Sequence, residues 1–222
     1  MTSPSSESVD VVDQPKAESF MDWFQINSRL VAAGAAVVVV VAGGLWIYKQ
    51  TAMNKTLNAD KQLMTAKQSL ASQNVPLAES DLKKVVDKYG DLPAGAEAGM
   101  TLAGLQMDNG DLNGAIATLK ALADRTSSGP NASSVRGMLG DAMVQASKPA
   151  EGAAEYERAA GLTDRRMEKA FWMSKAARAD IAAGKSADAR KILKALAAQS
   201  DNPAVAAEAR VRLGELSLAS RP

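Results

Sequence analysis

Apolar and polar positions follow a helical period over most of the chain, and the pattern itself recurs every 37 residues. Within residues 112–124, apolar side chains at i, i+1, i+4 and i+7 from Ala115 form the stripe of one helical face. The preceding segment, 93–107, is rich in Ala, Leu and Met, which are strong helix formers. Between the two, Gly110 suits a left-handed helix end and Asp111 suits the start of the next helix. The unit therefore predicts a helix, a tight turn and a second helix.

Two series of small residues share this 37-residue interval. The first comprises Ala66, Ala103, Gly140, Ala177 and Gly214, and the second comprises Ala78, Ala115, Gly152 and Ala189. Small residues are needed where the backbones of packed helices approach closely. A period of 20 to 50 residues is typical of stacked units that are each too small to bury their own apolar face. An irregular Ala-rich bundle, in which the spacings are chance, is the alternative.

We therefore predict an all-α protein whose repeat region, residues 54–219, is a solenoid of about four helix pairs and a capping helix. The first helices of the pairs are expected near 55–72, 94–109, 131–146 and 165–183, and the cap near 203–219. The segments Leu102-Ala103, Gly110-Asp111, Ala115, Leu119 and Leu122 resemble the tetratricopeptide repeat. The period departs from that repeat, which usually has 34 residues.

A long uncharged segment near the front of the chain predicts a membrane span. It runs from Leu30 to Tyr48 and has the length, about 28 Å as a helix, of a bilayer core. The span includes Leu30, Gly34, Val39, Gly43, Trp46 and Tyr48. Aromatic residues flank it at both ends (Phe20, Trp23, Phe24, Trp46 and Tyr48), so we assign 20–50 to a transmembrane helix with aromatic belts. A cleavable signal peptide is the alternative, although its apolar core is usually shorter.

The first 19 residues are mostly Ser, Asp, Glu and Pro and are expected to form a disordered tail. Basic residues around the span number two before it (Lys16, Arg29) and three after it (Lys49, Lys55, Lys61), a count that favours cytoplasmic repeats.

The order of acidic tail, aromatic-flanked span and repeat domain is similar to the YfgM-type ancillary subunit of the SecYEG translocon. The local match is Phe20-x-x-Trp23-Phe24-x-x-Asn27 before the span and Gly44-x-Trp46-x-Tyr48 at its end. The resemblance implies a bacterial inner-membrane protein with a single span, a cytoplasmic N-terminus and periplasmic repeats. It also implies the SecYEG translocon and a PpiD-type periplasmic chaperone as partners. A structural or scaffold subunit of another inner-membrane or cell-division complex is the alternative function.

The composition removes several classes of chemistry. The chain has 222 residues, a net charge of +1, and no Cys or His, which excludes thiol nucleophiles, imidazole bases and their zinc sites. The carboxylates lie on amphipathic helices, where a hydrated face is the ordinary explanation. We therefore expect a binding protein that is not an enzyme, with no cofactor, no metal, no nucleic acid and no small-molecule substrate.

The first helix of each pair is expected to line the partner-binding groove, as in tetratricopeptide repeats. Its candidate residues are Leu63, Leu70, Met100, Met107, Phe171, Trp172 and Arg178. Phe171 and Trp172 are the only adjacent aromatic pair of the repeat region, and Trp is enriched at binding hot spots. Core packing is the competing interpretation for this pair and for the two Met residues.

Overall fold

The computed structural model describes residues 27–199 and 202–219. The predicted tail, 1–19, and the aromatic residues Phe20, Trp23 and Phe24 lie outside these ranges. The chain divides into two compact units, Met1–Met53 and Asn54–Pro222, and each is considered by itself.

Helix α2, Ser28–Ala71, contributes to both units. From Ser28 to Met53, every residue whose exposure is described is exposed, including Val37 to Val41 and Leu45. By length and composition α2 is able to cross a membrane, a test that signal sequences near an N-terminus also pass. The predicted first repeat helix is therefore a continuation of the apolar helix, because residues 49–55 contain neither Gly nor Pro to end it.

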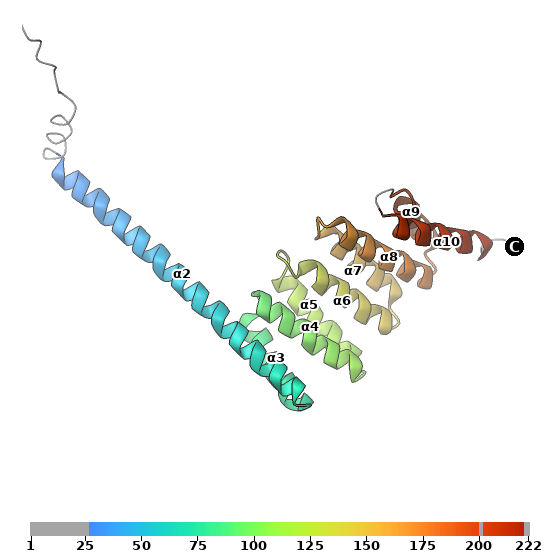
Figure 1. The fold of residues 1–222 in the computed structure, drawn as a ribbon, viewed down its shortest axis with the longest axis horizontal. Helices are drawn as coiled ribbons and strands as arrows, with labels where there is room; N and C mark the ends of the chain where they lie inside the picture. The colour runs from blue at the N-terminus through green and yellow to red at the C-terminus, as the bar shows by residue number, and fades with distance from the viewer. Residues whose placement is uncertain (1–26, 200–201, 220–222) are drawn as a thin grey trace, which may run out of the picture. The chain divides into compact units, whose positions relative to one another are not determined.

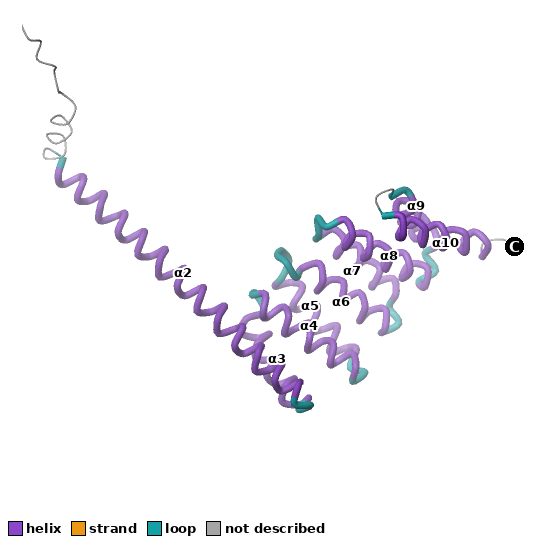
Figure 2. Tube along the Cα trace, viewed as in Figure 1, coloured by secondary structure: helices purple, strands orange, loops and turns teal. Residues whose placement is uncertain are grey.

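The second unit is built from antiparallel helices joined by short loops (Figures 1 and 2). After α2 come α3 (Val75–Tyr89), α4 (Pro93–Asp108), α5 (Leu112–Arg125), α6 (Ala132–Gln145), α7 (Pro149–Gly161), α8 (Arg166–Ala182), α9 (Ser186–Ala197) and α10 (Pro203–Ala219). Consecutive helices from α3 to α10 pack against each other, and α4 also contacts α6. The described residues thus contain no strand, which confirms the predicted all-α solenoid of four helix pairs and a final helix.

The four turns inside the helix pairs are equivalent. Each has a residue with positive φ, at Gln73 (59°), Gly110 (80°), Ser147 (59°) and Gly184 (75°), again 37 residues apart. The next amide donates back to a carbonyl five residues earlier, as in Asp111 N to Gln106 O at 2.7 Å. This is the Schellman ending of a helix, which favours Gly but tolerates other residues at some strain. Asp111 then caps α5, accepting from the Gly114 amide at 2.9 Å, as predicted.

Small residues do allow the close helix packing that the sequence predicted. A Cβ added to Gly140 on α6 would lie 2.7 Å from the Tyr156 ring and 3.1 Å from the carbonyl of Gly152 on α7. A Cβ on Gly152 would lie 2.9 Å from the Gly140 carbonyl. The two backbones therefore approach too closely for larger residues. The equivalent residues Ala66, Ala103 and Ala177 are fully buried, whereas Gly214 on α10 is exposed.

Candidate functional site

The predicted groove residues of the first two repeats mostly serve the core. Leu63 is 6% exposed and packs with Leu82 and Tyr89. Leu70 is half-buried against the same cluster, and Met100 and Met107 are half-buried against the core of the second repeat. These four side chains offer little area to a partner, because helix packing already covers most of it.

The predicted aromatic pair is divided between core and surface. Trp172 is 8% exposed, and its ring fills the space that a side chain at Gly137 on α6 would need. Phe171 is 50% exposed and meets Trp172 edge to face, with ring centroids 4.7 Å apart. Trp172 therefore packs the fourth repeat on the third, while half of the Phe171 side chain is exposed to solvent.

Lys175, one helical turn after Phe171, lies at the centre of a polar and aromatic cluster. Its ammonium lies 2.6 Å from the Asp141 carboxylate of α6 and 5.2 to 5.5 Å from the ring centroids of Phe171, Trp172 and Tyr156. Contacts of this kind between a cation and aromatic faces are attractive. The cluster joins α6, α7 and α8 and contacts one side of the Phe171 ring.

Tyr156 completes this cluster from α7. Its hydroxyl donates to Asp141. Burial raises the pKa of Tyr156, and the hydrogen bond to Asp141 raises it further. The hydroxyl therefore remains a protonated donor at any physiological pH. The hydroxyl positions the Asp141 carboxylate by this hydrogen bond. Asp141 in turn forms the ion pair that holds the Lys175 ammonium beside the aromatic rings.

Two cavities adjoin this cluster and share Lys175 and Arg178. One, of about 240 Å³, lies between α6, α7 and α8 and includes Asp141, Val144 and Tyr156. The other, of about 380 Å³, lies between α8 and α10 and includes Met167, Phe171, Val205 and Glu208.

Arg178 is exposed, and within the described ranges no hydrogen bond or ion pair involves it. We call the surface formed by Met167, Phe171, Lys175, Arg178 and Val205 the α8 groove.

The residues of the α8 groove are more typical of a peptide-binding surface than of a catalytic site. The groove combines an exposed aromatic ring, apolar side chains and two cations, the usual elements of a protein-binding surface. Sequence reasoning included Phe171 and Arg178 but missed Lys175. Its spacing of i+4 from Phe171 and i+3 from Trp172 was a signal that could have found it. Its contacts with Asp141 and Tyr156 come from other helices and left no local signal.

Comparisons with solved structures support the repeat architecture. Two crystal structures of nearly identical TPR-like repeats from a Podosopora anserina protein described as a kinesin light chain share 17% sequence identity with the chain. Each match covers 73% of this chain and 86% of the other, with TM-scores of 0.55 and 0.56. A likeness at this identity concerns the fold alone.

Sequence comparison defines the family. No curated protein matches the chain. The profile of the tetratricopeptide repeat-like domain matches residues 21–136 and again 61–175, which together extend over more than half of the sequence. This chain belongs to the tetratricopeptide repeat-like domain family.

Proposed function

We propose that the protein is a membrane-anchored adaptor that binds other proteins through its repeats. One observation carries the proposal: the uncharged segment 30–48, in which every residue whose exposure is described is exposed, precedes a stack of tetratricopeptide-like repeats in the same chain. Repeats of this family are typically non-enzymatic interaction scaffolds. A retained apolar helix would hold them at a bilayer surface, which raises their effective concentration for a neighbouring membrane protein.

The proposed setting is the bacterial inner membrane, with the N-terminus in the cytoplasm and the repeats in the periplasm. The proposed partners are the SecYEG translocon and a PpiD-type chaperone. The support is the resemblance of the tail, the aromatic-flanked span and the repeat domain to the YfgM-type subunit. A periplasm-specific reporter fused after Pro222 is expected to be active, and activity of a cytoplasm-specific reporter there would overturn this orientation.

The α8 groove is the proposed contact surface. Phe171 is half-exposed and contacts Trp172 and Lys175, and Arg178 is an exposed cation beside two cavities. Neither side chain belongs to the buried core, so both can be replaced with little effect on folding.

Crosslinking in intact cells, followed by purification of the full chain from solubilised membranes, tests this function. We expect SecY and the chaperone to be recovered with the natural chain and to be lost with Phe171→Ala or Arg178→Glu. Lys120→Glu, which makes the same charge change at an exposed residue of α5, is the matched control and should retain both partners. Recovery of an unrelated stoichiometric complex would support the alternative, a subunit of another membrane assembly, and would overturn the translocon assignment.

A further inference from the structure

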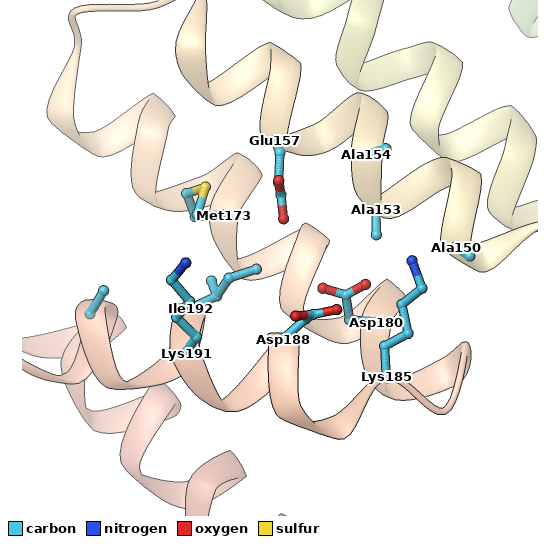
Figure 3. Close-up of a pocket in the computed structure, with 11 residues that line it drawn as sticks. Ala150, Ala153, Ala154, Glu157, Met173, Asp180, Lys185, Asp188, Lys191 and Ile192 are labelled. Atoms are coloured by element: carbon cyan, nitrogen blue, oxygen red, sulfur yellow. The ribbon is translucent and has the colours of Figure 1, made fainter.

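A further cavity of the repeat unit has none of the α8-groove residues in its lining. It has a volume of about 460 Å³ and lies between α7, α8 and α9, so the second helices of two successive repeats form its walls (Figure 3). Its apolar lining comes mainly from Ala150, Ala153, Met173, Ile192 and Ala195. A cavity of this size and character accommodates the aliphatic stem of one long side chain.

A carboxyl group that accepts no hydrogen bond from the described residues lines this cavity. Asp180 of α8 is 3% exposed, and among residues 27–199 and 202–219 no hydrogen bond or ion pair reaches its side chain. Figure 3 shows its carboxylate turned toward the same space as the carboxylates of Glu157 from α7 and Asp188 from α9. Asp180 is largely buried as a residue and accepts no hydrogen bond within the described part of the chain, which disfavours its ionised form, so the position is suited to a further cation.

The surroundings of Asp180 disfavour its negative charge. Asp180 is two residues from the end of α8, where the helix dipole is negative. Burial raises its pKa first, and the neighbouring charges of Glu157 and Asp188 raise it further, while Lys185 acts in the opposite direction. Lys185 and Lys191 lie on either side of the three carboxylates (Figure 3). The lining of the cavity therefore contains three carboxyl groups and two ammonium groups, so its acidic residues outnumber its basic ones.

A metal ion does not fit this arrangement. Within the described ranges, no three carboxylates lie close enough together to bind one. An organic cation fits better, because its charge is spread over several donors and its stem can contact the alanine-lined wall.

We propose that this cavity, which we call the Asp180 pocket, binds an arginine side chain from a basic segment of a protein partner. The guanidinium enters between Asp180, Glu157 and Asp188, and its flat fork of donors matches carboxylate geometry. The aliphatic stem lies along Ala153 and Ile192. The pocket shares α8 with the α8 groove but is lined by other residues, with α7 and α9 as its remaining walls. The inference therefore goes beyond the proposed function and does not depend on the identity of the translocon partner.

Methyl NMR of the full chain in detergent micelles tests the proposal directly, because Met173 and Ile192 line the pocket and carry reporter methyl groups. The probe is the tripeptide acetyl-Ala-Arg-Ala-amide. Its control is the same tripeptide with citrulline, which has nearly the same shape and no charge. We expect saturable shifts of the Met173 and Ile192 methyl signals with the arginine peptide and none with the citrulline peptide. The signals of Met100 and Ile116, in the second repeat, are expected to remain unchanged.

Two variants separate binding from folding. Asp180→Asn is expected to weaken the arginine peptide about tenfold, the loss that follows from one charge-assisted hydrogen bond. The double variant Glu157→Gln with Asp188→Asn changes only exposed residues and is expected to weaken binding as well. Asp124→Asn, which removes the same charge from an exposed residue of α5, should leave affinity unchanged. Equal shifts with both peptides, shifts at Met100 rather than Met173, or full affinity in both variants would overturn the proposal.

Discussion

Two stretches of the same helix show how differently apolar residues can be used. In α2, residues 28–53 are almost uniformly apolar up to Tyr48, and those whose exposure is described are exposed on every side. Residues 54–71 bury only the face with Ala59, Leu63 and Ala66, while Leu57 and Met64 remain exposed. The first stretch has no helical period because every side needs the same surroundings, which we propose to be lipid. The second has a period because one side meets protein and the other meets water.

The largest contrast is expected from two identical substitutions on this helix. Leu63→Ala removes a 6% exposed side chain from the first repeat's core and should lower the free energy of unfolding by about 2–5 kcal/mol. Leu57→Ala, at a residue 51% exposed, should change it by less than about 0.5 kcal/mol. Denaturant titration of the full chain in micelles, followed by circular dichroism, measures both. Equal effects would mean that the two faces of this stretch are not different.

The same contrast is sharpened by placing a charge in the first stretch. Val39→Asp lies at the centre of the proposed span and should disfavour membrane insertion by about 3 kcal/mol. The membrane-bound fraction of the expressed protein is expected to fall accordingly, whereas Val39→Leu should leave it unchanged. Fractionation of cells followed by immunodetection gives the result. A Val39→Asp chain that remains in the membrane to the same extent would contradict the assignment of this stretch to lipid.

A smaller effect is expected from Asp180, where the second unit itself contains an unfavourable charge. Because the folded-state pKa of Asp180 is raised, the folded protein holds this proton more tightly than the unfolded chain does. The natural chain therefore loses stability as pH rises from the ordinary range of an aspartate through the raised value, and Asp180→Asn does not undergo this loss. The stability advantage of the variant should be small at low pH and largest at neutral pH. Unfolding measured across that range checks the sign, with Asp124→Asn as the control.

Much of the fold could be predicted from the 37-residue repeat of the sequence. The exposure of individual side chains could not be predicted in this way. Ala66 and Ala103 are 37 residues apart, and the turns at Gly110 and Gly184 recur at a multiple of the same spacing. The order of the helices can therefore be predicted from the repeated pattern of small residues and turn residues. Phe171 and Trp172 are adjacent in sequence but have opposite surroundings, because only Trp172 faces the space above Gly137. That space is created by another helix and is not visible in the pattern of either one.

The candidate sites show the same limit. Lys175 is held by Asp141 and by three aromatic rings, and Tyr156 and Asp141 reach it from other helices. In the sequence, Asp180 is an ordinary polar residue near the end of a helix. Its burial results from packing against α7 and α9, which the sequence of α8 does not show. Both clusters depend on contacts between repeats, for which a single sequence carries no periodic signal.

The proposed anchor is tested most directly by the mass and extraction behaviour of the natural chain. After expression in a bacterial host, membranes are washed with alkaline carbonate, and the intact mass of the protein that remains is measured. We predict that the chain resists extraction and retains its entire first stretch, residues 28–53. A soluble product whose mass shows cleavage after this stretch would contradict the account, because the apolar helix would then be a removed signal and not an anchor.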